Sequence, residues 1–269
     1  MGLILSKLSG AKGYLNYGRG FDSDAVTFLT ATGITNIVQQ KAINELVKDL
    51  KGYGIWTKQK ALYPVVGGTS ARHAVNLRTP GTYNLSFTAG WIHSSTGMTP
   101  NGTSDYANTS LTPSSNTILG SFHHSIYSRV NSAVGIMGGC NSNETPQRYT
   151  YLSNSNTTTM INVINNTSLS TNSATITDTL GLMVGNRISS TIVNAFKNGV
   201  KVLNDTSNIV TERPTINYYI GGRNNVNVAS NFDNKQIAFY SIGDGLTDTE
   251  AANFYTAVQK FQTTLGRQV

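Results

Sequence analysis

The spacing of apolar positions changes near residue 64 of the 269-residue chain. Before that point, apolar residues recur three and four positions apart, as on one face of an amphipathic helix. After it, runs of four to eight residues alternate with clusters of Gly, Asn, Pro and Ser, as in an antiparallel β sandwich. The pattern therefore predicts a helical segment over residues 21–63 and a β domain over residues 64–269.

The helical segment is predicted to contain two helices. Three residues can cap the first one: Asp22, Ser23 and Asp24. Gly33 can end it, and a second helix begins near Thr35 and stops at Gly52. The second helix has an apolar face made by Ile43, Leu46, Val47 and Leu50. The next stretch, GIWTKQKALYP, is predicted to be a short turn of helix that ends at Pro64.

Ten runs after residue 64 are predicted to be strands: YNLSFTAG, SFHHSIYSRV, AVGIMGG, RYTYLS, TMINVIN, LGLMVGNR, TIVNAFKNG, VKVLND, INYYIGG and KQIAFYSIG. The strongest turn signal is Asn198-Gly199, because Asn-Gly accepts the positive φ angles of a tight hairpin. Short strands at this spacing indicate a mainly β, antiparallel sandwich.

The last residues carry a clear helix signal. Thr247 and Glu250 have the spacing of a capping box, in which each side chain accepts a hydrogen bond from a backbone N–H of the other residue. The apolar stripe that follows consists of Ala251, Phe254, Tyr255, Val258 and Phe261. Gly266 is the predicted stop. We expect this C-terminal helix to lie against the sandwich and to cover apolar surface that the last strands leave open.

Composition supports a β protein and excludes some partners. Charged residues make up 12% of the chain, whereas 29 residues are Asn, which suits turns and strand faces. The net charge of +7 comes from scattered Lys and Arg without a basic stripe, so no nucleic-acid partner is predicted. Cys140 is the only cysteine and is expected to be buried. The N-terminal apolar run is too short for a membrane span, and no membrane association is predicted.

Residues 1–20 contain five glycines, three basic residues and no acid. Such a segment has little means of folding alone, so we expect an anchoring arm that docks on a partner. The residues predicted to make this attachment are Lys7, Lys12, Tyr14, Tyr17 and Arg19. The alternative, an arm folded back on its own domain, stays open.

Three elements near the C-terminus occur in an order that is typical of a known fold. They are the Asn198-Gly199 turn, Ile220-Gly221-Gly222 at a strand end, and the LTDTE helix start at residues 246–250. This order resembles the closing half of a concanavalin A-like (laminin G-like) jelly-roll. The resemblance covers residues 180–261 well and residues 64–179 more loosely. It implies a jelly-roll sandwich, preceded by the helical segment and closed by the C-terminal helix.

A second resemblance spans most of residues 22–269. The strings DAVTFLTATGITNIVQQKAINELVKDLKGYGIWTKQKALYPVVGG, GWIHSSTGMTPNGTSDYANT and FYSIGDGLTDTEAANFYTAVQKFQTTLGRQV carry it. They resemble virion structural proteins of tailed phages, especially crAss-like phages. This implies a place in the virion, contacts with other capsid or tail proteins, and a homo-oligomer, for which we expect a trimer.

The phage resemblance leaves two functions open. A single sandwich behind a short arm suits a capsid decoration or short head-fibre protein that displays the jelly-roll outward. The alternative is a tail-fibre or receptor-binding module that recognises a host-surface glycan. Carbohydrate binding needs an aromatic face beside hydrogen-bonding groups. The candidate glycan site is Trp91, His93, Asn101 and Tyr106, although burial of Trp91 as a core strand residue is the interpretation that the residue type favours.

The sequence analysis predicts that the chain is not an enzyme. A hydrolase of this fold would need paired carboxylates, and laminarinase-type relatives carry them as alternating acids on one strand. Between Val65 and Leu182 the only acids are Asp105, Glu144 and Asp178, each alone. No metal or cofactor is predicted either. His123 and His124 would point to opposite faces of a strand, and His73 and His93 have no partner identifiable from the sequence.

Overall fold

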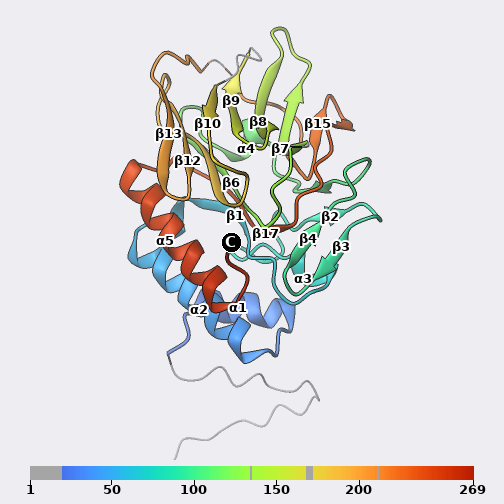
Figure 1. Cartoon of the computed structure of the whole chain (residues 1–269), viewed down its shortest axis with the longest axis vertical. Coiled ribbons are helices and arrows are strands. Elements are labelled where there is room, and N and C mark those ends of the chain that lie inside the picture. Colours follow the sequence, from blue (N-terminus) through green and yellow to red (C-terminus); the bar gives the residue numbers. More distant parts are fainter. Residues whose placement is uncertain (1–19, 134, 168–171, 211) are drawn as a thin grey trace, which may run out of the picture.

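The computed structural model describes residues 20–133, 135–167, 172–210 and 212–269. Two sheets pack face to face, with helices at one side (Figure 1), and their strands pair antiparallel except for β15 with β7. The prediction of a mainly β sandwich with helices before and after it is confirmed. The predicted attachment residues Lys7, Lys12, Tyr14, Tyr17 and Arg19 lie outside the described residues.

Sheet A has the strand order β13-β12-β11-β6-β17-β4-β3, and β1 pairs with β17. Its strands are β1 (Gln59–Tyr63), β3 (Ile92–Ser94), β4 (Gly97–Thr99), β6 (Phe122–Ser128), β11 (Gly181–Arg187), β12 (Val193–Lys197), β13 (Val200–Asp205) and β17 (Ile237–Gly243). The Asn198-Gly199 hairpin joins β12 to β13, with φ angles of +49° and +77° at the two turn residues, as predicted.

Sheet B has the strand order β10-β9-β8-β7-β14-β5-β2, and β15 pairs with β7 and β16 beside this path. Its strands are β2 (Ser86–Phe87), β5 (Ala107–Asn108), β7 (Ile136–Ser142), β8 (Arg148–Asn156), β9 (Thr159–Asn166), β10 (Ser173–Thr175), β14 (Tyr219–Ile220), β15 (Arg223–Asn225) and β16 (Val228–Ser230). Every predicted run contains a strand of one of the two sheets. The pattern missed mainly strands of two or three residues, which are too short to show an alternation.

The stretch before Pro64 corrects one prediction. Instead of a helical turn alone, the 3₁₀ helix η1 (Trp56–Lys58) leads into strand β1. Strand β1 pairs antiparallel with β17, and Tyr63 lies opposite Tyr240. The pairing satisfies the backbone groups of β1 and buries its side chains, a tertiary gain that local spacing does not reveal. The division of the chain at residue 64 stays a prediction.

The three predicted helices are confirmed, although Asn36, a cap that the sequence analysis did not name, begins the second one. Helix α1 (Ser23–Thr32) is capped by the Asp22 carboxylate and ends at Gly33 with a φ of +61°. Helix α2 (Ile37–Gly52) begins after Asn36, whose side chain accepts hydrogen bonds from two backbone N–H groups of the first turn. In helix α5 (Asp248–Thr264), both hydrogen bonds of the predicted capping box form. Two short helices, α3 (Ser70–His73) and α4 (Pro113–Asn116), lie in connections.

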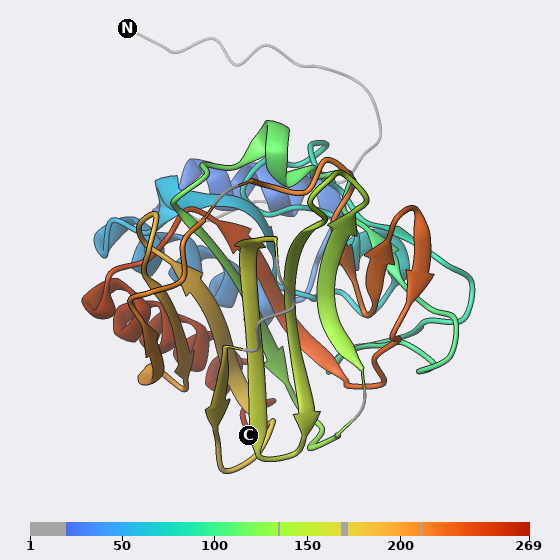
Figure 2. The same ribbon diagram turned by 90° about the horizontal axis from the view of Figure 1, so that it is seen from above.

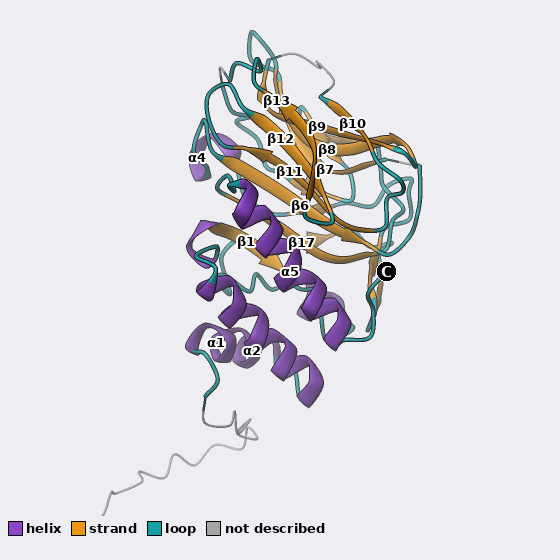
Figure 3. Ribbon diagram, turned by 60° about the vertical axis from the view of Figure 1, so that its left-hand side comes forward, coloured by secondary structure: helices purple, strands orange, loops and turns teal. Residues whose placement is uncertain are grey.

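Two large apolar cores result from this arrangement. One lies between the sheets, and the other lies between the outer face of sheet A and helices α1, α2 and α5. Phe254 of α5, for example, packs edge-on against Phe239 of β17, with 5.9 Å between ring centroids. The long helices therefore cover one side of the molecule and no other (Figures 2 and 3). As predicted, helix α5 covers apolar surface that the strands leave open.

Within the described ranges, no helix is long and apolar enough to cross a membrane.

Candidate functional site

The indole of Trp91 is buried at the start of β3, with 7% of its surface exposed. The rings of Phe87 and His93 lie beside it, at centroid distances of 5.3 and 6.3 Å. Gly221 passes so close that a Cβ atom there would lie 2.7 Å from the indole. These neighbours cover the ring, so Trp91 does not offer an open face to a sugar in this conformation.

His93 has a partner that the sequence did not reveal. Its Nδ1 lies 2.9 Å from Nδ1 of His73 on α3, so one ring donates a hydrogen bond to the other. Burial, with the neighbouring His93 and Arg267, lowers the pKa of His73 to about 3. Burial also lowers the pKa of His93. Both imidazoles are therefore neutral near pH 7 and connect α3 to β3.

Asn101 and Tyr106 make other contacts. The side-chain oxygen of Asn101 accepts hydrogen bonds from the N–H groups of Thr103 and Ser104, both at 2.9 Å, and so closes its own turn. The ring of Tyr106 stacks on Tyr219, with centroids 4.3 Å apart. Only Trp91 and His93 of the four predicted residues are in ring contact with each other. Their role in glycan binding stays a prediction.

The histidine pair on β6 lies on opposite faces of sheet A, as predicted. On the helix side, Nδ1 of His123 donates to the carbonyl oxygen of Asp244 at 2.6 Å, and Nε2 lies 3.1 Å from Ser241 Oγ. Between the sheets, the nitrogens of His124 lie 2.9 Å from Asn162 Oδ1 and from the Tyr218 hydroxyl. Burial lowers the pKa of His123 to about 4 and that of His124 to about 3.

The hydrogen bonds around His124 have one consistent direction. The amide nitrogen of Asn162 donates to the carbonyl oxygen of Asn194 at 3.0 Å, so its oxygen must face His124. Nε2 of the neutral imidazole therefore donates, and Nδ1 accepts from the Tyr218 hydroxyl. Tyr240 can then donate to Tyr218 across 2.9 Å. This chain joins the two sheets through the core, and both histidines have structural partners.

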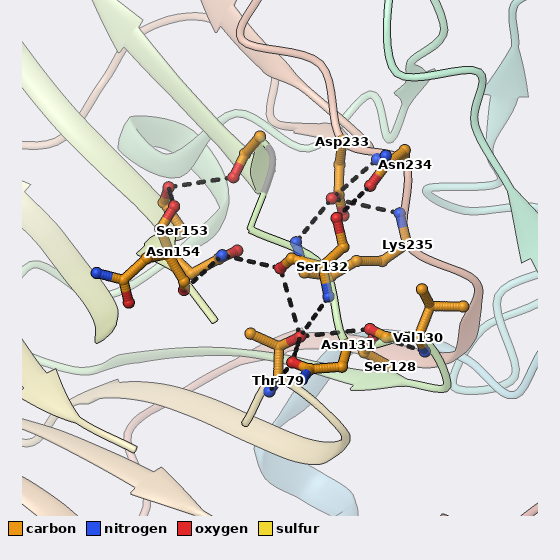
Figure 4. Close-up of polar contacts among 12 residues, drawn as sticks. Ser128, Val130, Asn131, Ser132, Ser153, Asn154, Thr179, Asp233, Asn234 and Lys235 are labelled. Atoms are coloured by element: carbon orange, nitrogen blue, oxygen red, sulfur yellow. Dashed lines mark hydrogen bonds and ion pairs between the residues drawn. The ribbon is translucent and has the colours of Figure 1, made fainter. Parts of the chain in front are cut away.

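A buried polar group at one end of the sandwich was not predicted from the sequence. This rim cluster consists of Ser132, Asn154, Thr179, Asp233 and Lys235. Its centre is an ion pair, with Lys235 Nζ 2.9 Å from Asp233 Oδ1 and no exposed surface on either side chain. In Figure 4, Ser132, Asn154 and Thr179, which come from three other segments of the chain, lie beside the loop that carries this pair.

The other members of the rim cluster connect those loops. The Ser132 N–H donates to Thr179 Oγ1, and the Asn154 amide donates to the Ser132 carbonyl, both at 3.0 Å. Burial raises the pKa of Asp233, although Lys235 opposes this effect. The second oxygen of Asp233 and the side-chain oxygen of Asn154 are buried and have no hydrogen-bond partner among the residues that the structure describes. Because a buried charge must be paired, the loop that carries Asp233 and Lys235 is fixed in one conformation. The hydrogen bonds of Ser132 and Asn154 then hold the neighbouring segments beside it.

One signal for the rim cluster was present in the sequence. Asp233 and Lys235 are two positions apart, the spacing that places side chains on one face of an extended segment. Nothing local showed that both would be buried.

Two carboxylates share one cation beside β8 of sheet B. Glu144 and Glu212 lie on either side of Arg148, at 4.0 and 3.8 Å from its guanidinium nitrogens. Burial opposes ionisation of Glu144, but hydrogen bonds from Ser142 and Thr215 outweigh it and lower the pKa. In the described part of the chain, no three His, Cys, Asp or Glu side chains gather closely enough to hold a metal ion.

Comparisons of the sequence gave no relative. No protein-family model matches it, and no curated protein does.

Solved structures, however, share the fold. Trypanosoma rangeli sialidase in complex with 2,3-difluorosialic acid, a covalent intermediate, matches with a TM-score of 0.51 and 9% identity over 81% of this chain. A mutant of the protein HCR/D matches with a TM-score of 0.53 and 10% identity over 76%. The chain spans 39% of the sialidase structure and 53% of HCR/D. At this identity, the likeness establishes the β-sandwich fold alone.

The comparison with sialidases corrects the prediction that the chain is not an enzyme. That prediction treated paired acids on a strand as the mark of a hydrolase in this fold. Enzymes occur among the structures that share the fold, so the fold gives no ground for excluding catalysis. The physical error lies in the premise, because sialidases use a tyrosine nucleophile in place of one carboxylate of the usual pair.

Proposed function

We propose that the chain is a structural protein of a tailed-phage virion, a capsid decoration or short head-fibre protein. The sequence resemblance over residues 22–269 supports this proposal. One structural observation carries it: helices α1, α2 and α5 share a core with sheet A, so the helical segment and the sandwich form one body. The described chain begins at the helical side, beside α1 (Figure 1). An arm preceding α1 would therefore extend from the helical side of the molecule. The sandwich would then lie on the side away from the attachment point.

The arm, residues 1–20, is the proposed attachment. Deleting it should leave a folded sandwich, because α1 is capped by Asp22 and needs no residue of the arm for its first turn. The shortened chain should fail to cosediment with phage particles that lack the native protein. The control for charge is the full-length chain in which Lys7, Lys12 and Arg19 are all replaced by Gln. Full attachment of the shortened chain would contradict the proposal.

A second candidate is recognition of a host-surface glycan. The favouring observation is the fold shared with a sialidase that was solved with 2,3-difluorosialic acid. Binding of the full chain to an immobilised glycan array tests it, with His93→Ala and Asn101→Ala as variants in the predicted site. A specific signal that both variants weaken would support recognition at that site. An array without any bound glycan would contradict it and leave the attachment result unaffected.

A further inference from the structure

One face of sheet B carries tyrosine, arginine and asparagine side chains. In the strand register, Tyr151 of β8 and Arg223 of β15 both lie opposite Gly139 of β7. Leu152, next to Tyr151, and Cys140, next to Gly139, belong to the core between the sheets. Because side chains alternate along a strand, Tyr151 and Arg223 point to the other, outer face of sheet B. The long helices pack on sheet A, so none of those described covers this outer face (Figure 3).

Two further residues extend the outer face along the strands. Asn141 lies on β7, and its register partner on β15 is Asn225. A Cβ atom at Gly139 would lie 2.3 Å from the Cβ atom of Tyr151, so any side chain there would displace the tyrosine. The glycine thus allows the Arg223 guanidinium to lie over the Tyr151 ring, with its central carbon 5.9 Å from the centroid. We call Asn141, Tyr151, Arg223 and Asn225 the outer-face site.

The charge of Arg223 has no carboxylate counter-ion in the described part of the chain. Its Nη2 donates to the side-chain oxygen of Asn231 at 3.1 Å, while its Nε is buried and has no hydrogen-bond partner among the described residues. Burial lowers the pKa of Arg223, yet a guanidinium keeps its proton near pH 7. An anion brought to this cation would be bound favourably, because charge-assisted hydrogen bonds are about twice as strong as neutral ones.

A hydrogen-bond acceptor on the same face also lacks a partner. Asn141 is 2% exposed, and its side-chain oxygen accepts no hydrogen bond from any residue that the structure describes. Burial raises the pKa of Tyr151, so the hydroxyl of this neighbour keeps its proton and can donate. Nearly all buried polar groups in folded proteins have partners. An unpaired donor and an unpaired acceptor in adjacent rows of one face therefore indicate a ligand position.

These groups specify the chemistry of the ligand. The Nε–H of Arg223 needs an acceptor, best an anionic one, whereas the Asn141 oxygen needs a donor such as a hydroxyl. A simple anion would satisfy only the first of them. The ring of Tyr151 suits the C–H groups of a sugar. A saccharide that bears a carboxylate or sulfate group meets all three requirements.

We propose that the outer-face site binds an acidic saccharide, with the anionic group at Arg223 and a sugar hydroxyl at Asn141. The inference rests on the second candidate function, recognition of a glycan, and assigns that recognition to sheet B instead of the surroundings of Trp91. The outer face of sheet B lies away from the helical side of the molecule (Figure 3). A virion partner attached at the helical side would therefore not cover it.

An array that pairs each acidic glycan with its neutral counterpart tests the inference on the full chain. We expect the bound glycans to carry a carboxylate or a sulfate, and the two kinds of acidic spot show which group is preferred. Arg223→Gln should weaken binding about 10-fold or more, because it removes a charged hydrogen bond. The matched control is Lys41→Gln on α2, which removes the same charge from an exposed position on the helical side and should bind as the wild type does.

Asn141→Asp tests the site without a change of size. The new carboxylate would lie in the row beside Arg223 and supply the counter-ion that this residue lacks. Acidic glycans should then bind about 10-fold or more weakly, while the melting temperature should not fall. Tyr151→Phe removes only a hydroxyl and should weaken binding about threefold. Thermal unfolding of each variant separates lost binding from lost folding.

Three results would overturn the inference. Acidic glycans bound equally by the wild type, Arg223→Gln and Asn141→Asp would exclude the outer-face site, and glycan recognition elsewhere on the chain would stand. A preference for the neutral member of each pair would contradict the role of Arg223. An array without any bound glycan would contradict glycan recognition itself. A signal lost in His93→Ala and Asn101→Ala but kept in Arg223→Gln would belong to the first result.

Discussion

The helix-covered face of sheet A and the rim cluster hold this molecule together in different ways. On the covered face, apolar side chains from α1, α2 and α5 pack against strands, and the few polar side chains buried among them, such as His123 and Gln262, are hydrogen-bonded. At the rim, an ion pair without exposed surface lies within the loop before β17, and hydrogen bonds of Ser132 connect this loop to neighbouring segments. The first region gains stability from area removed from water, whereas the second gains it only while both charges are present. The comparison shows that a sandwich closed by helices on one side can depend on buried charge on another.

Breaking the ion pair should have the largest effect. Asp233→Asn removes the charge that faces Lys235 and should lower the free energy of unfolding by about 3–5 kcal/mol. Urea denaturation measures this loss. The matched control is the double variant Asp233→Asn/Lys235→Met, which removes both charges and keeps a side-chain oxygen for the backbone N–H groups of Asn234 and Lys235, so it should recover much of the stability. If Asp233→Asn costs less than about 1 kcal/mol, the rim does not depend on its charges.

Removing a large buried side chain from the helix-covered face should lower the free energy of unfolding. Phe254 is fully buried against Phe239 and His123. Phe254→Ala should cost about 3 kcal/mol in the same denaturation experiment. Because Phe254 and the rim cluster share no partner, the double variant Phe254→Ala/Asp233→Asn should show the sum of the two losses. A strong departure from additivity would mean that the regions are coupled.

Acid should weaken the covered face through His123. Its pKa is about 4 in the folded protein and about 6.5 in an unfolded chain. Below pH 6.5 the unfolded state therefore binds more protons than the folded state, and stability falls as the pH drops toward 4. The contribution of one such histidine is at most about 1.4 kcal/mol per pH unit. His123→Gln should have a shallower dependence in denaturation series between pH 7 and 5, and an unchanged slope would contradict this account.

The smallest effect is expected at the start of α5. Thr247→Ala removes one side-chain oxygen of the capping box and should cost about 1 kcal/mol. Thr247→Ser is the control, since its hydroxyl can still accept the hydrogen bond from Glu250. A thermal melt that separates neither variant from the wild type would show that packing alone holds the helix start.

Much of the covered face was predictable from residues close in sequence. The capping box, the stripe beginning at Ala251 and the Gly33 stop are local signals, and each formed as expected. Strand β1 was not predictable in this way, because its pairing with β17 brings together residues about 180 positions apart. Very short strands such as β3 and β5 exist only because neighbouring strands complete their hydrogen bonds.

The candidate sites were less predictable than the fold. An aromatic residue in a polar stretch indicates a binding face, but Gly221 and Phe87 cover Trp91 only in the folded chain. His73 and His93 are 20 residues apart and meet because α3 and β3 are packed together. The inference about catalysis failed for another reason: it took one arrangement of acids as a requirement of the whole fold.

By itself, the sequence indicated the three long helices and the Asn198-Gly199 hairpin, because caps, turns and apolar spacing act over a few residues. It also determined the antiparallel sandwich, since short alternating runs can bury their apolar sides only against another sheet. Tertiary structure alone decided which polar side chains are buried away from solvent. Asp233 and Lys235 became an ion pair, and Trp91 a covered ring, because burial depends on segments that are distant in the chain and adjacent in space.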